Sequence, residues 1–231
     1  MNEADSEKLA AGLAKLGWKE AAKPDEADLA VVNTCVVRQK AEDRAAGYLG
    51  KLRKLKESRK GALPADRERL QIAVMGCMVG PRTDDLRSRF PYVDVWARPQ
   101  SFEVVLRAVL PESELGGEFW PDTFPEPKGP TAFVPIVHGC NKFCTYCIVP
   151  YRRGRERSRR VDEIAREVAS HCGKGVREVT LLGQTVEAYG KDLLADESGT
   201  KADLATLFEA VHETPGLARI RFLTSYPRDM T

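Results

Sequence analysis

The fold of this chain depends most on FVPIVHGCNKFCTYC, residues 133–147. Its first five residues are an apolar run that contains one proline, and they predict a buried β-strand. Directly after this run, Cys140, Cys144 and Cys147 follow at the spacing C-x3-C-x2-C. Three thiolates on one short loop can hold three irons of a [4Fe–4S] cube, which usually takes four cysteines. The spacing therefore predicts a cluster whose fourth iron is open to a ligand that the protein does not supply.

Other interpretations of this loop remain open at this point. A structural zinc ion in a non-catalytic RNA-binding module would need a fourth ligand, which His138 can supply. Zinc loops more often carry paired C-x2-C knuckles, and this loop does not. A disulfide is disfavoured because nothing marks the chain as secreted. Inert packing is disfavoured too, since three cysteines in eight residues are too dense for it.

Length and composition are those of a globular chain. The 231 residues suffice for one large or two modest domains, and 42% of them are apolar. The 36 basic and 34 acidic residues nearly cancel, so only the distribution of charge can indicate a partner. No apolar run approaches the roughly eighteen residues of a membrane helix, and the polar start is unlike a signal peptide. Six cysteines without a secretion signal indicate a reducing compartment, and we expect the cytoplasm.

The first half of the chain alternates between strand and helix patterns. Strands are expected at 28–33, 71–75 and 92–96, and helices at 3–16, 39–57, 83–89 and 101–110. This alternation predicts a parallel, doubly wound α/β sheet, in which ligands gather beyond the carboxyl ends of the strands. Cys35 and Cys77 follow two of these ends, although two buried apolar cysteines would fit the same positions. A domain of this type normally begins with a strand, so we expect its first strand to be missing.

A linker separates the two halves. Residues 111–130 contain five prolines and three glycines, and we expect domains at 1–112 and 131–231 joined by a linker at 113–130. After the linker, further strands are expected at 177–182 and 217–224, with helices at 162–171 and 203–212. A closed barrel needs roughly six to eight parallel strands. This second part therefore predicts only the first half of a (β/α) barrel.

An arginine-rich run follows the cysteine loop. Six of the ten residues in 151–160 are arginine. A solvated face is one explanation of such a run. Beside a predicted active site, however, arginines suggest an anionic, extended substrate such as RNA, because the guanidinium fork pairs with phosphates.

The longer run GCNKFCTYCIVPY, residues 139–151, resembles the radical S-adenosylmethionine enzymes, and within them the methylthiotransferase family of the tRNA-modifying MiaB type. This resemblance implies that S-adenosylmethionine ligates the open iron of the Cys140/Cys144/Cys147 cluster, and that Tyr146 lies against its adenine. The stretch GQTVEAYG, residues 183–190, is similar to a family loop near the methionine end of the cofactor. There Gly183 and Gln184 match the family, whereas Thr185 and Glu187 replace two asparagines.

The resemblance extends to the first half of the chain. The segments VNTC at 32–35, RQKAE at 38–42 and MGC at 75–77 resemble the N-terminal domain of methylthiotransferases, where three cysteines bind a second [4Fe–4S] cluster. Cys35 and Cys77 match two of these ligands. The third stands in the family directly before a Met-Asn pair such as Met1-Asn2, and this chain lacks it. We therefore expect a second cluster that is one ligand short, in a fragment that lacks both ends of the family's length.

The implied activity is methylthiolation of C2 of N6-isopentenyladenosine beside the anticodon of tRNA. A 5′-deoxyadenosyl radical attacks the C2–H bond, and the methylthio group assembled at the second cluster is delivered there. The implied partners are tRNA and a reducing electron-donor protein, and we expect a monomer. From the arginine run itself, we expect Arg152, Arg153 and Arg155 to contact tRNA phosphates. Sibling enzymes act on threonylcarbamoyl-adenosine or on a ribosomal-protein aspartate. The segments at 38–42 and 183–189 favour the MiaB type over both.

Overall fold

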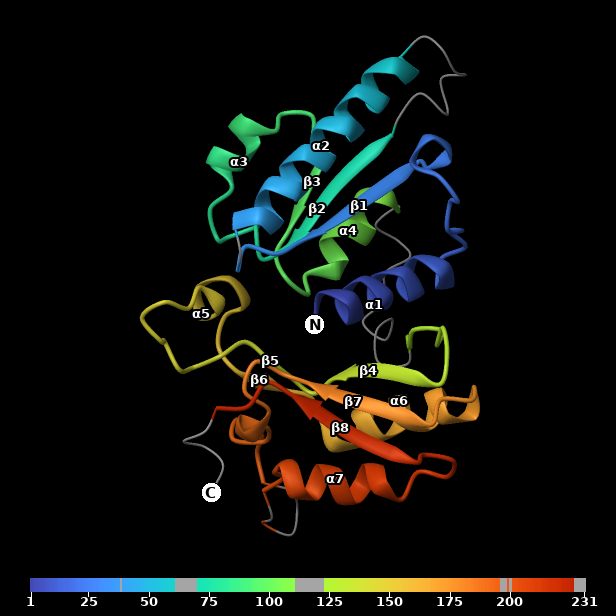
Figure 1. The fold of residues 1–231 in the computed structure, drawn as a ribbon, viewed down its shortest axis with the longest axis vertical. Coiled ribbons are helices and arrows are strands. Elements are labelled where there is room, and N and C mark those ends of the chain that lie inside the picture. Colours follow the sequence, from blue (N-terminus) through green and yellow to red (C-terminus); the bar gives the residue numbers. More distant parts are fainter. Residues whose placement is uncertain (38, 61–69, 111–122, 196–198, 200, 227–231) are drawn as a thin grey trace. The chain divides into compact units, whose positions relative to one another are not determined.

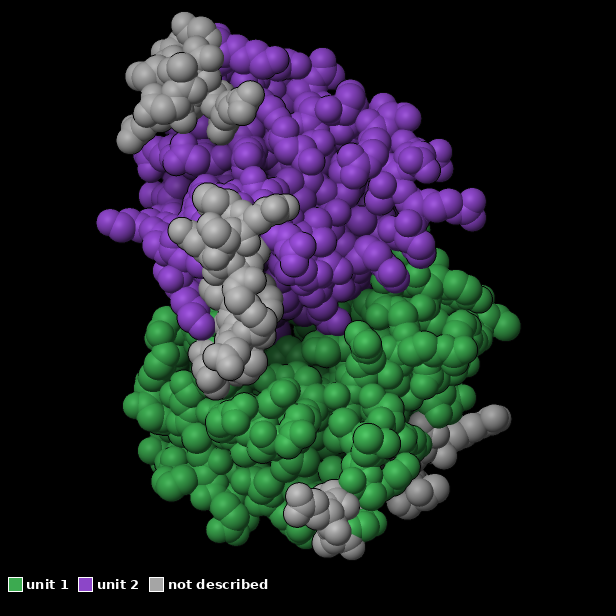
Figure 2. All heavy atoms as spheres, turned by 180° about the vertical axis from the view of Figure 1, so that it is seen from behind, with its two compact units in different colours: residues 1, 3, 118–231 green, residues 2, 4–117 purple. Residues whose placement is uncertain are grey.

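The computed structural model describes residues 1–37, 39–60, 70–110, 123–195, 199 and 201–226. Arg38, the polar connection at 61–69 and the part of the expected linker at 113–122 lie outside the described residues. The chain divides into two compact units, coloured separately in Figure 2. The N-terminal unit comprises residues 2 and 4–117, and the C-terminal unit comprises residues 1, 3 and 118–231.

The N-terminal unit is the predicted parallel α/β sheet (Figure 1). Its three parallel strands are in the order β1-β2-β3, so the second strand is central. The strands are β1 (Leu29–Thr34), β2 (Gln71–Gly76) and β3 (Val95–Ala97), and the helices are α1 (Asn2–Lys15), η1 (Pro24–Glu26), α2 (Gln39–Arg59), α3 (Asp84–Arg89) and α4 (Phe102–Val109).

The core of the N-terminal unit explains this arrangement. Leu49 and Leu52 of α2 are buried against Ile72 and Val74 of the central strand. The leucines recur at helical spacing, whereas the strand is buried almost throughout, as expected for a central parallel strand. The predicted strand at 92–96 starts later than expected, because only Val95–Ala97 pair with β2.

The C-terminal unit is a second parallel sheet, in the order β4-β7-β8, with a small antiparallel pair β5-β6. The strands are β4 (Thr131–Pro135), β5 (Val137–His138), β6 (Arg157–Ser158), β7 (Glu178–Leu182) and β8 (Arg219–Leu223). The helices are α5 (Val149–Arg153), α6 (Val161–Gly173), η3 (Val186–Ala188) and α7 (Leu204–His212). Parallel strands that alternate with helices agree with the predicted partial barrel.

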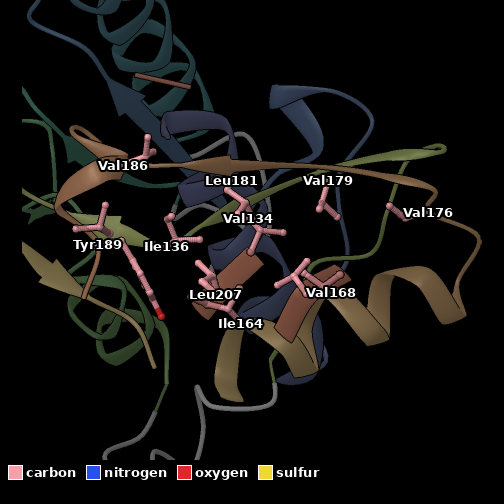
Figure 3. Packing of buried hydrophobic residues seen from close by; sticks show 12 residues of the cluster. Val134, Ile136, Ile164, Val168, Val176, Val179, Leu181, Val186, Tyr189 and Leu207 are labelled. Atoms are coloured by element: carbon pink, nitrogen blue, oxygen red, sulfur yellow. The ribbon is translucent and has the colours of Figure 1, made fainter. Parts of the chain in front are cut away.

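The core of the C-terminal unit lies between the sheet and its helices. Figure 3 shows Val134 of β4 and Leu181 of β7 packed with Ile164 of α6 and Leu207 of α7, all of them fully buried. This packing holds the three parallel strands in register, and it thereby positions the loops that leave their carboxyl ends.

Two local features of the C-terminal unit differ from expectation. The strand expected at 133–137 is split, since β4 ends at Pro135 and β5 begins at Val137. Ile136 lies between them, where its N–H donates to the Leu182 carbonyl and its own carbonyl accepts from Arg159 N–H. The chain thus leaves the parallel sheet for the antiparallel pair. The second difference is that the arginine run contains the end of α5 and all of β6, which no apolar periodicity indicated.

No helix among the described residues combines the length and the apolar character needed to cross a bilayer.

Candidate cluster-binding site

The cysteine loop leaves the antiparallel pair β5-β6. Val137 and His138 pair with Ser158 and Arg157, and the N–H of Cys140 donates to the Gly154 carbonyl at 3.0 Å. Gly139 has a positive φ of 72°, and a Cβ there would overlap the Arg155 carbonyl oxygen. Only glycine combines this backbone conformation with such a close approach. The start of the loop is therefore fixed against the segment that leads into β6.

A reciprocal set of hydrogen bonds fixes the residue after Cys140. The N–H of Asn141 donates to Glu156 Oε1 at 3.0 Å, and Asn141 Nδ2 donates to Glu156 Oε2 at 3.1 Å. In return, the N–H of Glu156 donates to Asn141 Oδ1 at 3.3 Å. The carboxylate and the amide thus bond to each other, and each accepts the backbone N–H of the other residue. We name this pair the Asn141–Glu156 clasp.

The bend between Cys140 and Cys144 is held by side chains. Phe143 has a φ of 45°, a left-handed conformation that is unusual for a bulky residue. Its ring lies edge-on to Tyr151 of α5, with centroids 5.8 Å apart, and the Arg155 guanidinium lies 5.2 Å from its centroid. These two contacts compensate for the strained backbone.

The three cysteines of the loop are all free thiols. Cys140 is buried, with 7% of its surface exposed, whereas Cys144 and Cys147 are half-buried. The N–H of Cys147 donates to the Cys144 carbonyl at 2.9 Å, which closes a turn between them. The sulfur of Cys140 lies 3.5 Å from Thr185 Oγ1 and accepts the N–H of Lys142, also at 3.5 Å. Three free thiols on one loop, one of them already accepting a backbone N–H, fit the donor set of a [4Fe–4S] cluster.

Within the described part of the chain, no group of three or more His, Cys, Asp or Glu side chains is gathered closely enough to hold a single metal ion. A cube differs from a single ion in this respect, because each thiolate binds a different iron. The pKa of His138, which precedes the loop, is lowered to about 3 by burial first, and then by Arg159 and Arg153. Its imidazole is therefore neutral at neutral pH.

The loop after β7 reaches the cysteine loop. A Cβ on Gly183 would lie 2.6 Å from Cγ1 of Val137, so glycine permits the two segments to pack closely. Two residues later, Thr185 is buried and its hydroxyl contacts Cys140. Gln184, between them, is half-buried. The structure thus brings together the cysteine loop and the predicted cofactor loop.

Glu187 ties this loop to the segment after β8. Its Oε1 accepts the N–H of Tyr226 at 2.9 Å and the hydroxyl of Ser225. The N–H of Val186 donates to the Thr224 carbonyl at 3.1 Å. Both residues that depart from the family's asparagines therefore make polar contacts: Thr185 with a cysteine sulfur, and Glu187 with the neighbouring strand end.

Tyr146 is the most exposed aromatic residue of the loop, with 90% of its surface open to solvent. Its ring makes none of the aromatic contacts that hold Phe143. An exposed ring between Cys144 and Cys147 is available to a planar ligand. Its place against the adenine of S-adenosylmethionine stays a prediction.

The arginine run is not a uniform solvated face. Arg159 is turned inward, where its Nη1 donates to the Pro135 carbonyl at 2.8 Å and pairs with Glu167 at 2.6 Å. Arg160 pairs with Asp162 at 2.8 Å. Two members of the run therefore have structural partners. Of the residues predicted to contact the substrate, Arg152 and Arg153 are half-buried in α5 and Arg155 is exposed. Their role in substrate binding stays a prediction.

Cys35 and Cys77 of the N-terminal unit are brought to one edge of its sheet. Thr34 and Gly76, which immediately precede them, are register partners on the parallel strands β1 and β2. The Thr34 hydroxyl donates to the Met75 carbonyl at 2.7 Å and accepts the N–H of Met78 at 3.2 Å. Cys77 is buried and Cys35 is half-buried. Their role as metal ligands stays a prediction, but they occupy adjacent strand ends, as parallel pairing requires.

The first turn of α1 lies beside the same edge. Asn2 Nδ2 donates to the Thr34 carbonyl at 2.9 Å, and the Asn2 carbonyl accepts from Asn33 Nδ2 at 2.8 Å. Gly76 has a φ of 96°, and a Cβ there would lie 2.5 Å from both Asn33 Oδ1 and the Thr34 carbonyl. Three segments of the N-terminal unit thus meet around the ends of β1 and β2.

Sequence reasoning did not assign a role to Asn141, Glu156 or Thr185. Glu156 had a detectable signal, because it is the one carboxylate in an otherwise basic run. Thr185 was noticed only as a departure from the family pattern. Its contact with Cys140 depends on how two loops approach in space, and sequence spacing does not report that.

Both halves of the chain match known protein families. Residues 1–98 match the family described as "Uncharacterized protein family UPF0004", and residues 134–230 match the radical SAM superfamily. Similar curated relatives are named tRNA-2-methylthio-N(6)-dimethylallyladenosine synthase. The relative from Dictyoglomus thermophilum is 41% identical over 100% of this chain and 52% of its own length. Those from Burkholderia lata and Aromatoleum aromaticum are 41% and 40% identical, over 51% and 53% of their lengths. The chain spans about half the length of the curated relatives it matches.

Proposed function

Since this chain belongs to the radical S-adenosylmethionine methylthiotransferase family, of the MiaB type, we propose that it acts in the 2-methylthiolation of N6-isopentenyladenosine in tRNA. The observation that carries the proposal is the loop of Cys140, Cys144 and Cys147. Its three free thiols follow β5, and its first sulfur accepts the N–H of Lys142 and contacts the Thr185 hydroxyl. Similarity over the whole chain to enzymes with this name supports the choice of substrate.

In this proposal Cys140, Cys144 and Cys147 hold a [4Fe–4S] cluster. When bound, the cluster and S-adenosylmethionine supply the radical chemistry that activates the adenine C2–H bond. The protein's own contribution is positioning. Gly139 and the Asn141–Glu156 clasp hold the loop, and the exposed Tyr146 ring receives the adenine of the cofactor. Gly183 and Gln184 line its methionine end.

Cys35 and Cys77 are proposed as ligands of the second cluster. The register of β1 and β2 supports this, because it places both thiols beyond adjacent strand ends. We propose domains at 1–112 and 131–231, joined by a linker at 113–130. The protein is further proposed to work as a cytoplasmic monomer that takes electrons from a reducing protein.

Arg152, Arg153 and Arg155 are proposed to contact the phosphates of tRNA. All three lie within a few residues of the cysteine loop, and Arg155 also stacks on Phe143 of that loop. Replacing all three with alanine should weaken RNA binding and flatten the dependence of log Kd on log salt by about one unit for each phosphate that is no longer neutralised. R87A, an exposed arginine of α3, is the matched control. An unchanged salt dependence of Kd in the triple variant would show that these arginines do not contact the phosphates of tRNA.

The function is tested by anaerobic reconstitution of the chain with iron and sulfide. The wild type should become brown, absorb broadly near about 400 nm and contain acid-labile sulfide. C144A should lose the iron of the cysteine loop, whereas C172A should keep it, because Cys172 lies outside the loop at the end of α6. The reduced protein should then cleave S-adenosylmethionine.

Substrate is identified by mass spectrometry of nucleosides and peptides after incubation with each candidate. A methylthio group on N6-isopentenyladenosine supports the proposal. A modified threonylcarbamoyl-adenosine or ribosomal-protein aspartate would assign the chain to a sibling enzyme. A colourless protein with one bound zinc ion would indicate a non-catalytic RNA-binding module instead of an enzyme.

A further inference from the structure

The three cysteines of the loop have unequal surroundings. The sulfur of Cys140 is contacted by the Thr185 hydroxyl and by the N–H of Lys142, both at 3.5 Å. Among the described residues, neither Cys144 nor Cys147 has a hydrogen bond at its sulfur, and both are more exposed than Cys140. One thiol of the site is therefore buried and hydrogen-bonded, while the other two are half-buried and have no such contact among the described residues.

The Thr185 hydroxyl is held in this position. Thr185 has 2% of its surface exposed, and Cys140 Sγ is the one hydrogen-bond partner of its hydroxyl within the described part of the chain. Its backbone is fixed as well, because its carbonyl accepts the N–H of Ala188 at 3.1 Å and the next N–H, that of Val186, donates to Thr224. A buried hydroxyl without a partner is unfavourable, so the contact with sulfur has a structural reason to persist.

The direction of this hydrogen bond follows from chemistry. Between a free thiol and a hydroxyl, either group can donate. A cysteine that binds metal is a thiolate and has no proton. With the site loaded, Thr185 must therefore donate and Cys140 must accept, alongside the second donor from Lys142.

Hydrogen bonds to the sulfur atoms of an iron–sulfur cluster are one of the factors that set the reduction potential of the cluster. Reduction adds one electron, and so one negative charge, to the cluster and its thiolates. A donor directed at a thiolate stabilises the more negative, reduced state and raises the potential.

We propose that Thr185 is a positioning residue that acts through Cys140: its hydroxyl donates to the thiolate and raises the reduction potential of the cluster on the cysteine loop. The proposal rests on the proposed function, because it requires that the loop bind a cluster. It assigns a role to a residue outside the three-cysteine motif.

The experiment is a redox titration of the reconstituted chain, followed by electron paramagnetic resonance with dithionite as reductant. T185V removes the hydroxyl and keeps the volume, whereas T185S keeps the hydroxyl. The midpoint potential of T185V should shift to a more negative value, and that of T185S should stay near the wild type. T180V is the matched control, since Thr180 is a buried threonine of β7, and it should not shift the potential.

A second measurement guards against a variant that fails to assemble. T185A also removes the hydroxyl but leaves space, and it should lose one exchangeable deuteron coupling that the wild type shows after reduction in D2O. An unchanged midpoint potential in both T185V and T185A, with iron content intact, would overturn the proposal. Loss of iron from both would show that the hydroxyl serves assembly instead, and would also overturn it. A wild type that binds no cluster would refute the proposed function itself.

Discussion

Each of the two units of this protein has a glycine–cysteine pair with a similar backbone conformation, but the structure around the pair differs. Each has a Gly-Cys pair, Gly76-Cys77 in the N-terminal unit and Gly139-Cys140 in the C-terminal unit. Both glycines have positive φ, 96° and 72°, and neither leaves room for a Cβ. In both units glycine thus permits the backbone to turn sharply against a neighbouring segment immediately before a cysteine.

The settings differ in what brings the cysteines together. Cys35 and Cys77 are far apart in sequence, and only the pairing of Thr34 with Gly76 makes them neighbours at the sheet edge. Cys140, Cys144 and Cys147 are close in sequence, and the fold only has to shape and support their loop. The N-terminal pair therefore depends on strand register, whereas the C-terminal triad depends on the contacts that hold one loop.

The largest effect is expected from G139A. A left-handed backbone costs an L side chain about 1–2 kcal/mol, and overlap with the Arg155 carbonyl adds about 1–3 kcal/mol. The free energy of unfolding, measured in denaturant titrations, should fall by about 3 kcal/mol. The amount of iron that the protein binds after reconstitution should decrease as well. G175A is the control, because Gly175 also has positive φ, 93°, but has nothing within 4 Å of a Cβ. It should lose only about 1 kcal/mol. Equal losses in the two variants would show that the close approach at Gly139 is unimportant.

The next effect tests the register of the N-terminal unit. T34V removes the hydroxyl that joins the Met75 carbonyl to the Met78 N–H and leaves both buried groups short of a partner. The free energy of unfolding should fall by about 2 kcal/mol, as measured by urea denaturation. T131V, at an exposed threonine of β4, should change it by less than about 0.5 kcal/mol. If T34V were as stable as the wild type, the link between the ends of β1 and β2 would not depend on this hydroxyl.

The smallest effect concerns the Asn141–Glu156 clasp. E156Q turns one acceptor into an amide N–H that faces Asn141 Nδ2, so it should destabilise the loop by about 1 kcal/mol and lower iron retention. The double variant N141D/E156Q reverses this bond, since the new carboxylate accepts from the new amide. It should recover the loss in both unfolding and iron assays. A double variant no better than E156Q would mean that the carboxylate acts through its charge.

Much of the fold could be predicted from the sequence, because its signals are local. The apolar run before Asn33 and the one that ends at Met75 were expected as strands, and both pair in parallel. The periodic leucines of the 39–57 segment were expected as a helix, and α2 extends to Arg59. These elements follow from side-chain periodicity, which each segment carries without help from the rest of the chain.

The candidate site was less predictable. The spacing of Cys140, Cys144 and Cys147 indicated the cluster loop. Nothing local indicated that Arg157 and Ser158 would form a strand with β5, or that Arg159 would turn inward to Glu167. A two-residue strand has no period to detect, and an arginine in a basic run is expected to be solvated until its partner is known.

The spacing of the thiols and the position of most helices and strands could be established without coordinates, since spacing and periodicity are properties of the chain. Three other features emerged only in the folded molecule: the residues before Cys35 and Cys77 are direct register partners, Glu156 clasps Asn141, and Thr185 touches Cys140. Such contacts depend on the register between strands and on the approach of separate loops, because the packing of the whole core sets both.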